Sequence, residues 1–131
     1  LEIGTGSGYQ AALLAEVAGQ VFSIERISEL SERAGKALHL AGYRNICLKV
    51  GDGSLGWQEK APFDRIIVTA GAPYVPDALK AQLGDEGFLV IPVGDQDIQY
   101  LNIIKKDGES FQKRISTACR FVKLVGKQGW S

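Results

Sequence analysis

Short apolar runs alternate with helix-forming stretches through most of the chain, and this alternation constrains the fold more than any other feature. The strand-like runs cover residues 1–3, 20–24, 46–50, 63–70 and 87–93. Helices are predicted between them at residues 9–18, 28–41 and 77–83, where Ala, Leu and apolar residues at helical spacing are frequent. Strands that alternate with helices in this way form parallel sheets whose two faces are both covered.

The alternation of strands and helices stops toward the end of the chain, where two strand-like runs flank Asp107 and Gly108. The runs cover residues 99–106 and 111–125, and an Asp-Gly pair between two such runs is typical of a β-hairpin. The sequence therefore predicts an α/β fold of the doubly wound, Rossmann-like kind, in which one mostly parallel sheet ends in an antiparallel C-terminal hairpin.

The length of 131 residues corresponds to about one domain, and the sequence shows no repeat, linker or low-complexity tract. Residues 1–131 are therefore expected to form a single domain. The chain contains no Met, and Leu1 already lies in a strand-like run. We therefore expect this chain to be a piece of a longer protein that lacks its N-terminal segment.

Composition and charge exclude several classes of protein. Hydrophobic residues make up 45% and charged residues 23% of the chain, which is ordinary globular usage rather than that of a disordered segment. The 15 basic and 15 acidic residues cancel, so neither a nucleic acid nor a membrane surface is an expected partner. A monomer is expected as well. Cys47 and Cys119 lack metal-ligand or redox spacing. They are predicted to be structural thiols of a cytoplasmic protein without a metal.

A glycine-rich loop separates the first predicted strand from the first predicted helix. Gly4, Gly6 and Gly8 let the chain turn sharply and approach a ligand closely, and the following helix presents its positive end. The dinucleotide fingerprint G-x-G-x-x-G is not met, because Tyr9 occupies the position of the third glycine. The loop therefore predicts a bound ligand with a polar or anionic group, and a purely structural turn is the alternative.

Two carboxylates follow the next two predicted strands. Glu25 comes at the end of the second strand, where a carboxylate can accept both hydroxyls of a ribose. Asp52 lies between two glycines after the third strand, where it can accept a hydrogen bond from an exocyclic amine such as that of adenine. The apolar side chains of Ile27 and Leu55 can sandwich a purine, although core packing explains them as well. Because ligands bind beyond the carboxyl ends of parallel strands, these loops together predict an adenosine-containing ligand.

Residues 1–9 resemble the first motif of the class I S-adenosylmethionine-dependent methyltransferases. A larger set of segments resembles the protein-L-isoaspartate O-methyltransferase family, which methylates damaged aspartyl residues. These segments are residues 4–12, 23–27, 51–53, 61–70, 89–94 and 120–122. The resemblance covers nearly the whole chain, and its most specific parts are the Ala-Pro-Phe-Asp segment at 61–64 and the Ile-Pro-Val-Gly segment at 91–94.

The resemblance implies a function, a cofactor and a set of site residues. The expected enzyme uses S-adenosyl-L-methionine to methylate the α-carboxylate of L-isoaspartyl, and by extension D-aspartyl, residues in damaged proteins, which are then repaired through a succinimide. The implied cofactor contacts are Gly4, Thr5 and Gly6 at the methionine part, Glu25 at the ribose, and Asp52 with Gly53 at the adenine. Gly8, Arg26 and Val125 are further implied cofactor contacts, with no part of the cofactor assigned to them. The implied substrate contacts are Thr69, Ala70 and Val122.

The resemblance also implies what this chain does not contain. The family's substrate loop, with the hydroxyl residue usually credited with catalysis, lies upstream of the first motif and outside residues 1–131, so the catalytic residue is left unassigned. An α-carboxylate is already ionised at neutral pH, so its methylation needs no general base, and the only histidine, His39, falls in mid-helix. The family usually has Pro where Lys123 stands. The alternatives are a catalytically incomplete cofactor-binding module or another class I methyltransferase.

Overall fold

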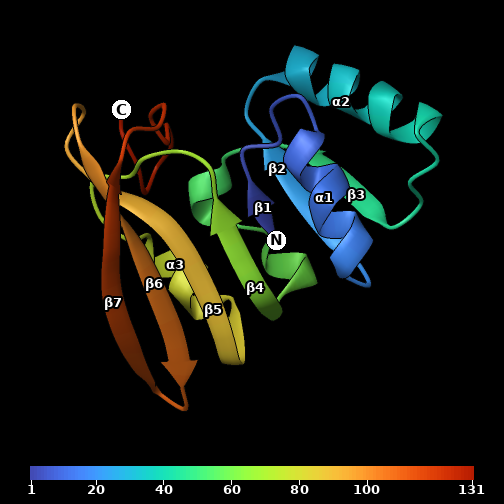
Figure 1. Cartoon of the computed structure of the whole chain (residues 1–131). Helices are drawn as coiled ribbons and strands as arrows, with labels where there is room; N and C mark the ends of the chain where they lie inside the picture. The colour runs from blue at the N-terminus through green and yellow to red at the C-terminus, as the bar shows by residue number, and fades with distance from the viewer.

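A seven-stranded sheet forms the centre of the computed structural model, which describes residues 1–131 (Figure 1). Its strands are β1 (Glu2–Ile3), β2 (Val21–Glu25), β3 (Ile46–Val50), β4 (Phe63–Val68), β5 (Leu83–Gly94), β6 (Gln99–Asp107) and β7 (Ser110–Cys119). They lie in the order β3-β2-β1-β4-β5-β6-β7. The first five strands pair in parallel, whereas β6 is antiparallel to both of its neighbours. The predicted sheet with its antiparallel hairpin is confirmed.

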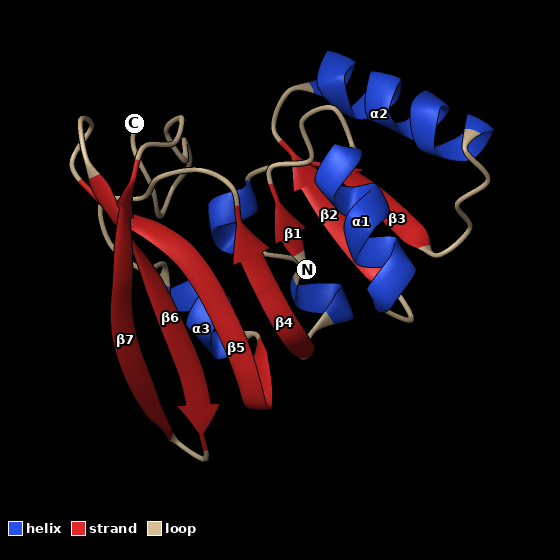
Figure 2. Ribbon diagram, viewed as in Figure 1, coloured by secondary structure: helices blue, strands red, loops and turns tan.

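Helices cover both faces of this sheet. They are α1 (Tyr9–Val17), α2 (Ser28–Leu40) and α3 (Asp77–Ala81), with two 3₁₀ turns at Gly53–Leu55 and Gln58–Lys60. Figure 2 shows α1 in front of the sheet and α3 behind it. This arrangement is the doubly wound one that the alternation of strands and helices predicts. No helix is both long enough and apolar enough to cross a bilayer.

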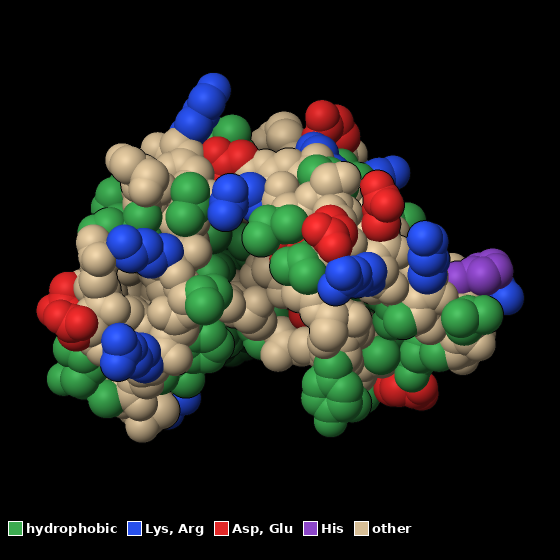
Figure 3. All heavy atoms as spheres, turned by 90° about the horizontal axis from the view of Figure 1, so that it is seen from above, with side chains coloured by type: hydrophobic (Ala, Val, Ile, Leu, Met, Phe, Trp, Pro, Cys, Tyr) green, Lys and Arg blue, Asp and Glu red, His purple; other side chains and the backbone are tan.

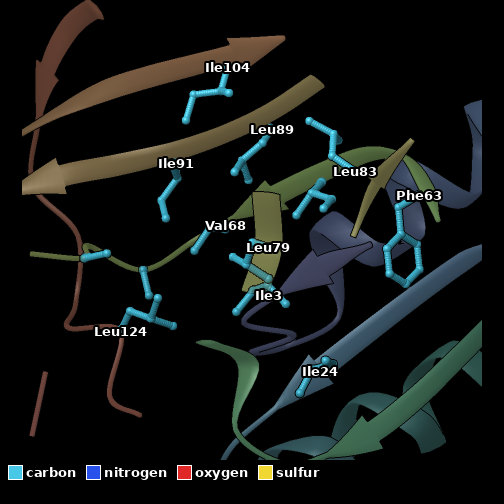
Figure 4. Packing of buried hydrophobic residues seen from close by; sticks show 13 residues of the cluster. Ile3, Ile24, Phe63, Val68, Leu79, Leu83, Leu89, Ile91, Ile104 and Leu124 are labelled. Atoms are coloured by element: carbon cyan, nitrogen blue, oxygen red, sulfur yellow. The ribbon is translucent and has the colours of Figure 1, made fainter. Parts of the chain in front are cut away.

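The main core is a cluster of thirteen buried apolar residues that joins β4, β5 and β6 to α3 (Figure 4). Alternate residues of β5, Leu89 and Ile91, point into this cluster because successive side chains of a strand face opposite sides. Leu79 of α3 is fully buried against them, and burial of one such side chain contributes about 1.5–3 kcal/mol. Leu124, from the C-terminal end of the chain, belongs to the same cluster.

The ends of several elements differ from the sequence prediction, and β4 for example ends at Val68 instead of residue 70. The predicted helix at 77–83 stops at Ala81, and β5 begins at Leu83 rather than at residue 87. Leu83 pairs with Phe63 and is buried, so its place in the core favours a strand. The pairing of β4 with β5 shifts register between Leu83 and Phe88, and Glu86, with a positive φ of 58°, lies in this irregular stretch. Similarly, β7 ends at Cys119 instead of residue 125.

The last twelve residues, 120–131, are here called the tail. The tail leaves the sheet after β7 and crosses back toward β4, where Lys123 forms a parallel bridge with Gly71. A second bridge, between Val125 and Trp130, closes the tail into a loop. The tail pairs with a connecting segment rather than with β6, which is why the predicted long strand ends early.

Candidate functional site

A cavity of about 410 Å³ opens beyond the carboxyl ends of β1, β2 and β4. Figure 3 looks onto this end of the molecule and shows hydrophobic side chains gathered toward its middle. The predicted site residues in the wall are Gly4, Gly6, Glu25, Arg26, Gly53, Thr69, Ala70, Val122 and Val125. The cavity lies where ligands bind in open α/β sheets.

The glycine loop approaches the cavity with its backbone. Gly4 has a φ of 98°, and a Cβ atom there would lie 2.5 Å from Thr69 Oγ1, so only glycine fits this close approach. The Thr69 hydroxyl lies 2.9 Å from the Gly4 carbonyl oxygen, to which it can donate a hydrogen bond. Gly6 has a φ of 56°, and no atom lies within 4 Å of the place where its Cβ would stand. The backbone at Gly6 is therefore open toward a ligand.

Glu25 lies opposite the glycine loop and is held by main-chain donors. Its Oε1 accepts a hydrogen bond from the Gly6 N–H at 3.0 Å, and its Oε2 accepts one from the Ile27 N–H at 2.9 Å. Only 8% of the residue is exposed, although it lines the cavity. An ionised carboxylate has about four acceptor positions, so each oxygen of Glu25 can accept a further hydrogen bond from a ligand.

Two predicted contacts of the glycine loop do not reach the cavity wall. Thr5 is buried beneath the loop, where its hydroxyl lies 2.6 Å from that of Ser23. Gly8 precedes α1 and faces α2, so that a Cβ at this position would lie 3.2 Å from the Cβ of Ala34. Both residues therefore support the loop from the side away from the cavity. Their spacing in the sequence could not distinguish this supporting role from direct contact with a ligand.

A buried carboxyl that sequence reasoning missed lies under the same loop. Glu2 is fully buried in β1, and its Oε1 accepts a hydrogen bond from the Ser23 hydroxyl at 2.5 Å, while its Oε2 has no partner. Burial raises the pKa of Glu2 above its usual value of 4.5. The signal in the sequence is an acidic residue between Leu1 and Ile3, inside an apolar run.

The structure does not bring Asp52 into the cavity wall, although its neighbour Gly53 is there. Asp52 Oδ1 accepts hydrogen bonds from the N–H and the hydroxyl of Ser54, at 2.9 and 2.6 Å. Its Oδ2 accepts one from the Lys127 N–H at 2.8 Å. Burial disfavours the charged form of Asp52, but these hydrogen bonds outweigh burial and lower the pKa of the carboxyl.

The tail forms the wall of the cavity opposite the glycine loop. The Gly71 N–H donates to the Val122 carbonyl at 2.7 Å, and the Leu124 N–H donates to the Gly71 carbonyl at 2.8 Å. These bonds place Val122 and Val125 in the wall, together with Lys123 and Leu124, which sequence reasoning missed. Leu30 is also in the wall, whereas Leu55, a predicted purine contact, is not.

The strand order, the glycine loop and the carboxylate at the end of β2 together place this chain among the Rossmann-like α/β domains. Over residues 1–129 the sequence matches the family model described as Protein-L-isoaspartate(D-aspartate) O-methyltransferase (PCMT). The chain belongs to this family, as the resemblance of its segments predicts.

Known proteins agree with this assignment. The protein-L-isoaspartate O-methyltransferase of Dictyoglomus thermophilum is 54% identical over 130 residues, which are 99% of this chain and 59% of that protein. A solved protein-L-isoaspartate O-methyltransferase superimposes with a TM-score of 0.90 at 30% identity, over 98% of this chain and 42% of the other. A Plasmodium falciparum protein described as such a methyltransferase, in complex with S-adenosyl-L-homocysteine, shares the fold with a TM-score of 0.80 at 24% identity, over 95% of this chain and 64% of its own. The chain thus spans about three fifths of the length of the curated relative.

Proposed function

We propose that this chain binds S-adenosyl-L-methionine and serves the methylation of the α-carboxylate of L-isoaspartyl residues in damaged proteins. The observation that carries the proposal is the cavity itself, in which the open backbone at Gly6 faces the buried carboxylate of Glu25. Membership of the family supports the same cofactor and substrate. The bound S-adenosyl-L-homocysteine of the Plasmodium falciparum protein, the demethylated form of this cofactor, adds support.

The residues present fit this cofactor. The cavity volume of about 410 Å³ lies within the usual range of small-molecule sites, and its wall is largely apolar. The spare acceptor positions of Glu25 suit the two ribose hydroxyls, and Ile27, Gly53 and Val125 offer apolar or backbone surface to adenine. Gly4 and Gly6 would then hold the methionine part. When bound, the cofactor supplies an electrophilic methyl group on a sulfonium.

The substrate is proposed to approach between the end of β4 and the tail. Thr69 and Ala70 border the cavity on one side and Val122 on the other. The Thr69 hydroxyl is hydrogen bonded to the backbone of the glycine loop, so we assign it a role in shape rather than in proton transfer. Lys123 in the same wall adds a positive charge that favours an anionic acceptor, and Arg26 adds another near the ribose side.

The chain's contribution to the reaction is then orientation and exclusion of water. An isoaspartyl α-carboxylate has a pKa near 3.5 and is ionised at neutral pH, so it can attack the methyl group without a base. The glycine loop and Glu25 fix the cofactor, and the tail covers it. Correct alignment of two reactants and a dry site are sufficient to lower the barrier substantially.

Two measurements test this proposal. Titration calorimetry of the 131-residue chain with S-adenosyl-L-homocysteine is expected to show binding, while NAD gives none. Methyl transfer from labelled S-adenosyl-L-methionine is then measured on paired peptides that differ only in aspartate or isoaspartate, and only the isoaspartyl peptide should be labelled. Absence of S-adenosyl-L-homocysteine binding would refute the cofactor, and equal labelling of both peptides would refute the substrate.

A second candidate function is a cofactor-binding portion whose methyl transfer requires further residues. The observation that favours it is the span of this chain, which covers 59% of the Dictyoglomus thermophilum relative. Binding of S-adenosyl-L-homocysteine with no labelling of either peptide would support this candidate. Labelling restored by a longer form of the same protein would then assign transfer to the whole enzyme.

We also propose that the protein works in a reducing compartment such as the cytoplasm. Both cysteines are free thiols, with Cys47 exposed and Cys119 partly exposed, and such thiols persist in reducing surroundings. Action as a monomer, without nucleic acid or membrane, stays a prediction that light scattering and binding assays can test.

A further inference from the structure

We propose that Gln99 is a positioning residue for methyl transfer, because its side-chain amide holds the beginning of the tail at the substrate side of the cavity. The proposal deepens the function proposed above and rests on it for the identity of the substrate. Gln99 is the first residue of β6 and is only 2% exposed, yet it does not line the cavity. A polar side chain that is buried so completely is costly unless hydrogen bonds satisfy it. Its partners therefore show which parts of the chain it serves.

The amide of Gln99 connects the tail to the turn between β5 and β6. Its Oε1 accepts a hydrogen bond from the Phe121 N–H at 2.8 Å, and its Nε2 donates one to the Asp95 carbonyl oxygen at 2.7 Å. Phe121 is the second residue of the tail, and Asp95 directly follows β5. Because one partner is a donor and the other an acceptor, only one orientation of the amide satisfies both. The side chain therefore holds the tail in one fixed place relative to this turn.

The main chain of Gly71 packs against the same amide. A Cβ atom at Gly71 would lie 2.9 Å from Gln99 Cδ and 3.0 Å from Gln99 Oε1, so only glycine fits here without displacing the side chain. Gly71 in turn binds the tail, since its N–H donates to the Val122 carbonyl at 2.7 Å and its carbonyl accepts the Leu124 N–H at 2.8 Å. The amide of Gln99 thus fixes the tail directly at Phe121 and indirectly through Gly71.

The residues on the substrate side of the cavity directly follow the bond to Gln99. Val122 and Lys123 come one and two positions after Phe121, and both lie in the cavity wall. Both are exposed and outside the main core, so their place in the wall depends on how the main chain before and after them is held. Gln99 holds this main chain at its beginning. The residue should therefore affect the binding of the peptide more than that of the cofactor.

The later part of the tail has anchors of its own. Leu124 is 5% exposed and belongs to the main core, and the indole Nε1 of Trp130 donates to the Gly71 carbonyl at 3.1 Å. Neither contact involves the side chain of Gln99. Loss of the Gln99 amide should therefore loosen residues 120–123 without unfolding the domain or releasing the rest of the tail.

The test uses two variants that disturb the same amide. Gln99→Met keeps the length of the side chain but has no amide for either hydrogen bond, and Gly71→Ala presses on the amide with its Cβ. Should Gln99→Met fail to fold by circular dichroism, Gly71→Ala decides by the same measurements. The matched control is Asn102→Leu, because Asn102 is another buried amide of β6, bonded to the Tyr100 carbonyl at 2.9 Å and not to the tail.

Two measurements are made on each variant. Amide hydrogen exchange of the free 131-residue chain reports on the tail. Methyl transfer to the isoaspartyl peptide is measured on the form of the protein that labels it, whether this is the 131-residue chain or the longer form considered above. Titration with S-adenosyl-L-homocysteine gives the affinity for the cofactor product.

Both test variants are expected to raise the KM for the isoaspartyl peptide about fivefold, which corresponds to the loss of about one neutral hydrogen bond. The kcat and the affinity for S-adenosyl-L-homocysteine should stay close to those of the parent, since a bound peptide can still hold the loosened segment in place. In the free chain, the amides of Gly71 and Leu124 should exchange faster, together with that of Phe121. Asn102→Leu should match the parent chain in KM and in the exchange of these amides.

Three outcomes would overturn the proposal. Faster exchange at Phe121 alone, with Gly71 and Leu124 still protected, would show that Gln99 contacts the tail without holding it. Equal changes in Gln99→Met and Asn102→Leu would show a general loss of stability, and a lower kcat with an unchanged KM would place the role away from peptide binding. If no form of the protein transfers a methyl group, the proposed function fails, whereas exchange in the free chain still decides whether Gln99 holds the tail.

Discussion

The two walls of the cavity are built in different ways. The glycine-loop wall rests on neighbouring strands, because Gly6 follows β1, Glu25 is the last residue of β2, and one hydrogen bond of 3.0 Å joins the two residues. The tail wall depends on partners more than fifty residues away, such as Gly71 for Trp130 and Asp52 for Lys127. The first wall is a property of the sheet, while the second is held by a few side-chain and main-chain contacts.

This difference predicts a division of roles. The loop wall lies between paired strands and a buried core, so it should present the same surface with or without a ligand. The tail wall has exposed residues such as Val122 and Lys123 and can open locally at a smaller cost in free energy. Substitutions in the loop wall should therefore change ligand affinity most, and those in the tail wall should change it less.

The largest expected effect is that of Gly6→Val. A β-branched residue at a φ of 56° is strained by about 1–3 kcal/mol, and its side chain would enter the space that is open at Gly6. We expect loss of detectable S-adenosyl-L-homocysteine binding in calorimetry, with a circular dichroism spectrum like that of the parent. Gly19→Ala, in a position with ordinary φ and free space, is the control. Retained affinity in Gly6→Val would contradict the loop assignment.

The next effect is that of Glu25→Ala, which should weaken binding by roughly 1–3 kcal/mol, the cost of lost hydrogen bonds to a charged group. Two backbone donors, the Gly6 and Ile27 N–H groups, would also lose their acceptor. Calorimetry measures the loss, and Glu29→Ala, which removes an exposed carboxylate of α2, is the control. Equal affinities of Glu25→Ala and the parent chain would mean that the ribose lies elsewhere.

The difference between the loop wall and the tail wall also explains which parts of the site could be predicted from the sequence. The loop wall follows from local rules, since glycines after β1 and an acidic residue at the end of β2 can be recognised from spacing alone. The tail wall depends on pairing across the fold, so residues 120–125 read as a continuation of β7 although they bridge to Gly71. Burial of Leu83 in the core likewise sets the start of β5. Both the bridge from the tail to Gly71 and the burial of Leu83 depend on contacts between distant parts of the chain, so a short stretch of sequence cannot predict them.

A pH effect on stability should distinguish Glu2 from the exposed acids. The pKa of Glu2 is raised in the folded chain, so between its unfolded value near 4.5 and its folded value the folded state binds more protons than the unfolded state. The free energy of unfolding should therefore fall as the pH rises through this window.

Glu2→Gln should remove that fall and stabilise the chain at pH 8 by about 1–2 kcal/mol, because an unsatisfied buried group no longer carries a charge. Denaturant titrations at pH 4 and pH 8 measure this difference. An unchanged pH dependence would mean that another group is responsible.

The smallest expected effect lies in the tail wall. Trp130→Phe keeps an aromatic ring but removes the hydrogen bond to the Gly71 carbonyl, which should cost about 0.5–1.5 kcal/mol of local stability. Hydrogen exchange of the tail amides measures this cost, while the global midpoint of unfolding should move little because Leu124 remains in the core. Trp57→Phe is the matched control, since the Trp57 indole packs edge-on against Phe22 and makes no such hydrogen bond. If Trp130→Phe weakened ligand binding as much as Glu25→Ala does, the tail would be as rigid a wall as the glycine loop, and the contrast between the two would be lost.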